Sequence, residues 1–243
     1  TVRKDDGTPL KVFTPFYKRW MTHPWRPFAD PDVTFADRRD LCVGSRRGPG
    51  TASVLAAGEA AAWERFDEWS ARAMSRYKDD RNDPSVDGTS MMSPYLKFGV
   101  VHPRQLLARL DGSAGSDHFR SEIVWREFYA DVLFREPSSA WANLNQQMNA
   151  MPLDTDARAA ERFQRWASGT TGFPIVDAGM RQLLHTGWMH NRVRMIVASF
   201  MIKHLMIDWR RGEKPGWKKN PCNPHRLMVE WTHQQRKGTT CWP

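Results

Sequence analysis

Apolar residues recur every three or four positions along most of the chain, which is the period of an amphipathic helix. The first predicted helix covers about residues 52–77, with Ala62, Phe66, Trp69 and Ala73 on one face. A short helix is predicted to begin at Ser93, and longer helices over about residues 102–110, 118–134, 157–167, 174–185 and 188–207. No segment alternates apolar and polar residues as a half-buried strand does. The pattern therefore predicts an all-α, multi-helix fold.

Two stretches lack this period. Residues 1–50 hold many Pro, Arg and Asp and predict a linker-like segment, irregular apart from an apolar patch at 12–17. After residue 213 the composition changes abruptly, and residues 214–243 form a basic tail rich in Pro, Trp and Cys. A native binding tail and a frameshifted or artificial end are the alternatives, and the abrupt change favours the second. The expected organisation is a linker over 1–50, a helical domain over 51–213 and this tail.

Composition narrows the class of protein. The 243 residues are 40% hydrophobic and 26% charged, which is typical of a globular chain. No apolar run is long enough to span a membrane, and the polar start does not resemble a signal peptide. Three cysteines give neither a disulfide scaffold nor zinc-site spacing, so we expect a cytoplasmic monomer without a metal site. The net charge of +9 suggests a polyanionic partner, although the tail supplies much of it.

The helix over 118–134 carries the clearest candidate chemistry. Glu122, Trp125, Arg126 and Tyr129 are spaced i, i+3, i+4 and i+7, so they form one polar and aromatic stripe. The opposite stripe is apolar and can pack on a core; it consists of Ile123, Val124, Phe128 and Val132. The mixed stripe either lines a cleft or is a solvated face with a Glu122–Arg126 pair. Spacing alone favours the solvated face.

Two further groups are candidates for ligand contacts. Trp188, Asn191 and Arg194 are three residues apart on one side of an apolar helix, so their polar groups need a partner. That partner is either a protein carboxylate or a bound ligand. The hydroxyls and backbone N–H groups of residues 88–93 can hold a phosphate, or they form an ordinary loop with capping serines. No Ser/His/Asp arrangement, Walker loop, GxGxxG or metal-ligand cluster appears, so conventional hydrolysis is unsupported.

Longer blocks carry a family resemblance. Residues 171–183 read TGFPIVDAGMRQL, and residues 186–195 read TGWMHNRVRM. With Asp87-Gly88-Thr89-Ser90, Ser93 and the run WREFY at 125–129, these blocks resemble the FAD-binding helical domain of the DNA photolyase/cryptochrome family. The resemblance covers about residues 70–213 and is greatest to bacterial and archaeal enzymes that repair cyclobutane pyrimidine dimers.

The resemblance implies a cofactor and its contacts. FAD is the expected cofactor, and an antenna chromophore accompanies it in full-length members of the family. The residues expected to contact FAD are Tyr77, Thr89, Ser90, Met92, Ser93, Phe119, Arg126, Trp188, Asn191 and Arg194. The implied chemistry is electron donation from excited, reduced FAD to a dimer flipped out of the DNA.

The resemblance also implies the contacts to damaged DNA. The DNA-binding residues are expected to be Arg81, Glu122, Trp125, Tyr129 and Asn191. Glu122 would hydrogen-bond the base edge of the dimer, and Trp125 would stack on it. Trp209 would belong to a tryptophan electron-transfer chain, so the catalytic set is Glu122, Trp125, Asn191 and Trp209.

Some features depart from the family pattern. We expect the N-terminal antenna domain to be absent, because the sequence begins near the interdomain linker of the family. We also expect the C-terminal block of the flavin pocket to be absent, because the match ends at about Lys214. Met91 stands where an arginine is usual, and Phe119 replaces a tryptophan of some members. The prediction is a light-dependent photolyase lineage, with the activity of this chain left open. A cryptochrome-type photoreceptor and a catalytically inactive DNA-binding fragment are the alternatives.

Overall fold

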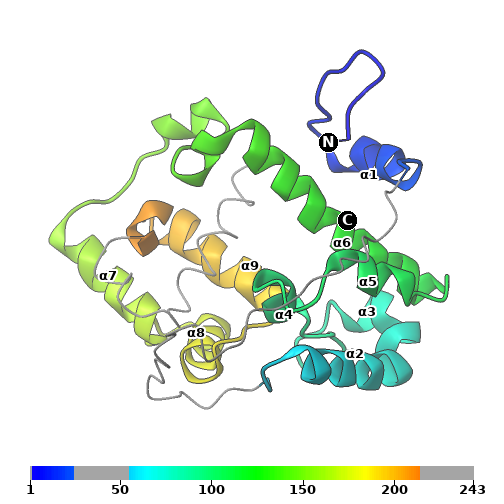
Figure 1. The fold of residues 1–243 in the computed structure, drawn as a ribbon. Coiled ribbons are helices and arrows are strands. Elements are labelled where there is room, and N and C mark those ends of the chain that lie inside the picture. Colours follow the sequence, from blue (N-terminus) through cyan, green and yellow to red (C-terminus); the bar gives the residue numbers. More distant parts are fainter. Residues whose placement is uncertain (1, 25–54, 214–243) are drawn as a thin grey trace, which may run out of the picture. The chain divides into compact units, whose positions relative to one another are not determined.

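The computed structural model describes residues 2–24 and 55–213, and their regular structure is helical (Figure 1). The chain divides into two compact units, residues 1–52 and 53–243. In the part that is described, Arg3 and Pro9 form an isolated antiparallel bridge, and no strand is present. None of the described helices is both long and apolar enough to cross a bilayer. The prediction of a helical fold is confirmed, whereas the tail at 214–243 and most of the predicted linker lie outside the described residues.

The first unit contains α1 (Phe13–Met21), a helix that the prediction of an irregular segment missed. Phe16 and Trp20 are one turn apart and both are buried, so α1 has one apolar face. Arg19 pairs with Asp5 at 2.5 Å and joins the helix to the turn before it. The apolar patch at 12–17 is therefore the first half of an amphipathic helix, whose short length hid its period.

The first half of the second unit packs around one aromatic cluster, the first core. The predicted helix over 52–77 is shorter than expected, because it begins after Gly58 and tightens at Met74. The first core includes Phe66, Trp69, Tyr77 and Phe119. Its helices are α2 (Glu59–Ala73), the 3-10 turn η2 (Met74–Arg76), α3 (Tyr77–Asp80), α4 (Ser93–Lys97), α5 (Pro103–Ala108) and α6 (Ala114–Arg135).

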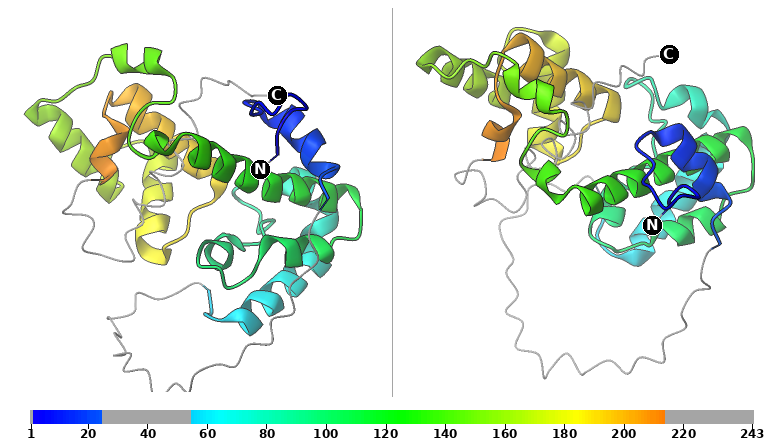
Figure 2. Two further views of the ribbon diagram at one scale, coloured as in Figure 1. Left: turned by 45° about the horizontal axis from the view of Figure 1, so that its top comes forward. Right: turned by 90° about the horizontal axis from the view of Figure 1, so that it is seen from above.

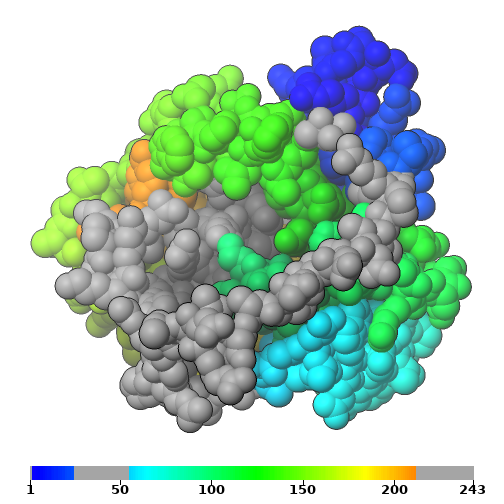
Figure 3. Space-filling view, viewed as in Figure 1, coloured from blue at the N-terminus to red at the C-terminus, as the bar shows by residue number. Residues whose placement is uncertain are grey.

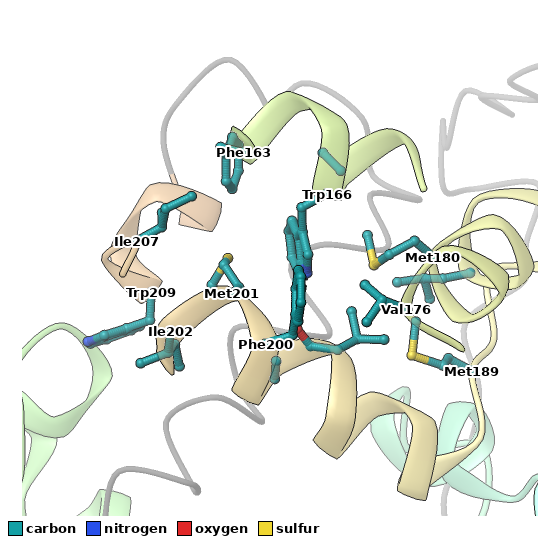
Figure 4. Close-up of a cluster of buried hydrophobic side chains, with 14 of the residues drawn as sticks. Phe163, Trp166, Val176, Met180, Met189, Phe200, Met201, Ile202, Ile207 and Trp209 are labelled. Carbon is teal, nitrogen blue, oxygen red and sulfur yellow. Dashed lines mark hydrogen bonds between the residues drawn. The ribbon is translucent and has the colours of Figure 1, made fainter. Parts of the chain in front are cut away.

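The second half forms another cluster, the second core, which Figure 4 shows at close range. Trp166 and Met180 point into it from separate helices, together with Met201 and Trp209. The elements of this half of the chain are η3 (Pro137–Ala140), η4 (Gln146–Ala150), α7 (Ala157–Ser168), α8 (Pro174–Thr186), α9 (Asn191–Ser199), the π-helical turn η5 (Phe200–His204) and η6 (Trp209–Glu213), and the last five contribute side chains to the second core. Figure 2 shows α7, α8 and α9 grouped together from two further directions.

Local signals explain the ends of the helices in the second core. The Asp156 carboxylate accepts a hydrogen bond from the Ala159 N–H and begins α7. Gly169 and Gly187 adopt left-handed conformations, with φ of 68° and 73°, and end α7 and α8. The prediction of one helix over 188–207 is wrong at both ends, because α9 begins at Asn191 and widens into a π-turn at Phe200.

The loop before α8 is organised by one buried carboxylate. Asp177 accepts hydrogen bonds from the Thr171 N–H at 2.8 Å, the Thr171 hydroxyl at 2.6 Å and the Gly172 N–H at 2.9 Å. Burial alone raises the pKa of Asp177, but these hydrogen bonds outweigh it and hold the pKa below its usual value. The block TGFPIVD therefore forms a turn that is held by hydrogen bonds to its own Asp177, and this turn fixes the start of α8.

Candidate functional site

Three buried aromatic rings, those of Trp69, Tyr77 and Phe119, pack against one another at the candidate site. Tyr77, at the start of α3, packs edge-on against Trp69 at 5.3 Å and against Phe119 at 5.6 Å between ring centroids. Burial raises the pKa of the Tyr77 phenol, the nearby Glu122 carboxylate raises it further, and Arg81 partly offsets both. The phenol therefore remains neutral, so Tyr77 supplies an apolar ring with a hydroxyl that can donate a hydrogen bond. The structure brings together two predicted cofactor contacts, Tyr77 and Phe119.

Glu122 and Arg81 form an ion pair beside the Tyr77 ring. The Arg81 Nη1 donates to Glu122 Oε1 at 2.5 Å, and both side chains are partly buried. The Arg81 guanidinium also lies 6.0 Å from the centre of the Tyr77 ring. The alternative of a Glu122–Arg126 pair on one helix is wrong, because Glu122 pairs with Arg81, which follows α3, while Arg126 contacts Glu127 at 3.5 Å.

The rest of the stripe on α6 is aromatic and partly exposed. Trp125 stacks on Tyr129 with ring centroids 5.5 Å apart and the planes 22° from parallel. The Arg126 Nη2 donates to the Leu96 carbonyl at 3.4 Å, which joins α6 to α4. The predicted packing stripe is confirmed, since its members are all buried: Ile123, Val124, Phe128 and Val132. One face of α6 therefore covers a core while the other presents an acid, two aromatic rings and a guanidinium.

The loop over residues 87–93 lies against α2. Ser90 and Met92 are buried, Thr89 is half-buried and Ser93 is exposed. The Ser90 hydroxyl accepts a hydrogen bond from the Met92 N–H at 3.3 Å, and α4 begins without a side-chain cap. The serines therefore do not act as helix caps here, contrary to the alternative interpretation of this loop.

Two α2 side chains hold this loop, and the sequence analysis missed both in that role. The Trp69 Nε1 donates to the Gly88 carbonyl at 3.0 Å. Arg65 donates from Nη2 to the Thr89 carbonyl and from Nε to the Ser90 carbonyl, each at 3.3 Å. Arg65 and Trp69 are one helical turn apart, so their spacing was the available signal. This spacing shows that Arg65 and Trp69 share one face of α2, but it does not show which segment of the chain they contact.

The start of α9 holds the third predicted group. Trp188 lies before the helix and Asn191 is its first residue, so they do not share a helical stripe as predicted. Asn191 is exposed, while the Arg194 Nη2 donates to the Met189 carbonyl at 3.5 Å. Arg192 donates from Nε to the Asn82 side-chain oxygen at 3.0 Å, which ties α9 to the polar loop after α3.

His190 caps α9, and the sequence analysis did not single it out. It is buried, and its Nδ1 accepts the Arg192 N–H at 3.1 Å. Burial and the Arg192 charge lower the pKa of His190, which Asp83 partly offsets, so the ring is neutral near pH 7. With Nδ1 accepting, Nε2 carries the proton, and within residues 2–24 and 55–213 no group accepts a hydrogen bond from it.

Trp209 lies in the second core rather than beside the loop over 87–93. It is fully buried, and its Nε1 donates to the Asn143 side-chain oxygen at 3.2 Å. Figure 4 shows its ring at the edge of the second core, near Ile202. The predicted site residues therefore fall in two groups, and Asn82–Arg192 is a direct link between their segments.

A family model describes part of this chain. Residues 119–220 match the model for the FAD binding domain of DNA photolyase. The match extends past residue 214, where we expected the resemblance to end. It begins within α6, includes the mixed stripe of that helix, and covers α7, α8 and α9.

Named relatives match over most of this chain. A deoxyribodipyrimidine photo-lyase of Alkalihalophilus pseudofirmus is 40% identical over 235 residues, which is 88% of this chain and 47% of that protein. A bacterial class III photolyase from Agrobacterium tumefaciens superposes with a TM-score of 0.75 at 32% identity, covering 96% of this chain and 52% of that one. A cryptochrome of Synechocystis superposes with a TM-score of 0.69 at 27% identity, covering 96% and 53%. The chain spans about half the length of the relatives it matches.

Proposed function

Since the chain belongs to the DNA photolyase/cryptochrome family through its FAD-binding helical domain, we propose that it serves the light-dependent repair of cyclobutane pyrimidine dimers in DNA. The proposed partner is damaged DNA, bound by a cytoplasmic monomer. The observation that carries the proposal is the Arg81–Glu122 ion pair beside Tyr77, with Trp125 three residues after Glu122 on the same face of α6. A hydrogen-bonding acid and a partly exposed indole on one helix face suit a flipped base, which needs edge contacts and stacking.

The residues of the first core fit the cofactor. The Thr89 and Ser90 hydroxyls and the peptide groups of their loop form a donor set suited to a diphosphate. Tyr77 and Phe119 supply apolar rings beside that loop. The other proposed cofactor contacts are Met92, Ser93, Arg126, Trp188, Asn191 and Arg194. When bound and reduced, FAD supplies the electron that splits the dimer on illumination.

The protein groups have positioning roles in this scheme. Glu122 accepts a hydrogen bond from the dimer's base edge, and Arg81 holds the carboxylate in place until DNA binds. Trp125 stacks on the flipped bases, and its own stacking on Tyr129 limits its rotation. Tyr129 and Asn191 complete the proposed DNA-binding set. Trp209, dry and hydrogen-bonded to Asn143, is proposed to pass electrons rather than protons.

Trp125→Ala tests the assignment of the stripe to DNA. Base–aromatic stacking contributes about 1–3 kcal/mol per base, so the preference for dimer-containing over undamaged duplex should fall about 5- to 150-fold. Filter binding with both duplexes measures the preference, while absorbance follows bound flavin, which should not change. Trp141→Ala is a matched control, because Trp141 is 62% exposed and lies beyond α6.

The outcomes separate the candidate functions. Loss of flavin with an unchanged preference for damage would mean that Trp125 faces the cofactor, which contradicts the proposal. The similarity to a cryptochrome favours a photoreceptor as the second candidate. A chain that binds flavin but neither prefers dimers nor repairs them under blue light would support the photoreceptor instead.

A further inference from the structure

Side chains of α2 hold the loop over residues 88–91 from one side, through hydrogen bonds to the backbone carbonyl groups of the loop. The carbonyls of Gly88, Thr89 and Ser90 all accept hydrogen bonds from α2, the first from Trp69 and the other two from Arg65. Three successive peptide groups are therefore fixed by two side chains of one helix.

Peptide geometry then decides where the N–H groups point. The described peptide bonds are all trans, and in a trans peptide the N–H lies opposite the C=O of the same unit. The N–H groups of Thr89, Ser90 and Met91 share peptide units with the three held carbonyls, so they point away from α2. Among the residues that the structure describes, none accepts a hydrogen bond from these three N–H groups. Met91 has a left-handed φ of 55°, which bends the chain at the end of this row.

Charge and close packing reinforce this arrangement. The Arg65 side chain is 19% exposed, so its charge lies behind the loop and polarises the peptide groups that it binds. Asp87 anchors the start of the loop to Arg72 at 2.7 Å and to Arg65 at 3.5 Å. On the α3 side, a Cβ on Gly88 would lie 2.5 Å from the Asp80 Cβ. The loop therefore has little freedom to rotate its peptide groups. Figure 3 shows atoms of α2 (cyan) and α6 (green) on one face of this unit.

We infer that Arg65, together with Trp69, is a positioning residue that turns three successive peptide N–H groups toward the diphosphate of the bound dinucleotide. The inference rests on the proposed function, which assigns this loop to FAD. Arg65 acts through the loop and does not itself touch the ligand. The contacts of Arg65 restrict the rotation of these peptide groups, so less free energy is spent on ordering the donor row when the diphosphate binds.

Arg65→Met in the full chain is the principal test, with FAD, ADP and riboflavin as the three probes. Calorimetry measures ADP, and fluorescence anisotropy measures the two flavins. Losing two charge-assisted hydrogen bonds should weaken FAD and ADP about 10-fold, while riboflavin, which has no diphosphate, stays within about 2-fold. Arg72→Met is the matched control, because Arg72 contacts Asp87 but, among the described residues, none of the three carbonyls. It should change all three affinities by less than about 2-fold, because Asp87 keeps its contact with Arg65 and the three carbonyls keep their donors.

The outcomes distinguish the inference from the function on which it rests. If the unsubstituted chain binds FAD and ADP and Arg65→Met binds ADP equally well, the inference alone is overturned. Equal losses for ADP and riboflavin would also overturn it, because they indicate general damage to the fold. If the unsubstituted chain binds none of the probes, the inference and the proposed function both fail. Should Arg65→Met not fold, Arg65→Lys replaces it and must still weaken ADP more than riboflavin.

Discussion

The two cores of the second unit bury similar aromatic side chains but differ in the polar groups that are bonded around them. At the first core, Arg65 of α2 donates to two carbonyls of the loop after α3. Arg81, which follows α3, donates to the Glu122 carboxylate of α6. In the second core, the indole N–H groups of Trp166 and Trp209 bind the Val197 carbonyl and the Asn143 side chain. Both cores therefore enclose an indole N–H, since Trp69 of the first core donates to the Gly88 carbonyl, but the first core also has Arg65 and Arg81 bound in place at its edge. The first core suits a ligand that needs hydrogen-bond donors and charged groups. The second core suits an electron-transfer residue, which has to be shielded from water.

The largest expected difference between the cores is in the unfolding free energy that each loses when a close-packed glycine is replaced by alanine. A Cβ on Gly115 of α6 would lie 1.7 Å from the Met74 carbonyl oxygen, a backbone atom that cannot move aside cheaply. A Cβ on Gly179 of α8 would lie 2.4 Å from Val193 Cγ1, which belongs to a side chain that can shift. Gly115→Ala should therefore cost about 3 kcal/mol or more, and Gly179→Ala about 1 kcal/mol after the gain in helix propensity. Urea unfolding measures both, and equal losses would contradict the view that the first core has the more rigid contact.

A smaller effect tests whether the second core depends on its enclosed hydrogen bonds. Asn143→Ala removes the acceptor of the Trp209 indole N–H and leaves that buried donor without it. The expected loss is about 1–3 kcal/mol of unfolding free energy, with faster hydrogen exchange at the Trp209 indole. Gln147→Ala is the control, since Gln147 is exposed and should cost much less. Unchanged exchange in Asn143→Ala would show that this bond does not protect Trp209.

The smallest effect concerns the junction between the two groups of site residues, where His190 caps α9. Its pKa is lower in the folded chain than the value of about 6.5 of an unfolded histidine, so the unfolded state binds the proton more readily. Its contribution to stability is therefore complete above about pH 6.5 and is lost as the pH falls below that value, by at most about 1.4 kcal/mol per pH unit.

His190→Asn checks this pH dependence. Asparagine keeps a side-chain oxygen that can cap α9 but has no titrating ring. Unfolding free energies measured between about pH 5 and 8 should fall less steeply toward acid in His190→Asn than in the unsubstituted chain. The same slope in both proteins would mean that His190 does not carry the acid sensitivity.

The sequence alone determined the features that depend on neighbours along the chain. The three- and four-residue period located α6, α7 and α8, because that period reports which face of a helix is apolar. The left-handed glycine at residue 169 and Pro174 marked helix ends from residue type alone. The stripe on α6 was divided correctly into buried and exposed sides for the same reason.

Only the tertiary structure decided which distant groups meet. Periodicity placed Glu122 on a polar face, but its partner is Arg81, and Arg65 meets the carbonyls of a loop more than twenty residues away. The break of α2 at Met74 and the π-turn at Phe200 likewise had no local signal in the apolar pattern. A helical pattern encodes the direction in which a side chain points. The group that it contacts depends on how separate elements come together, which no spacing within one element contains.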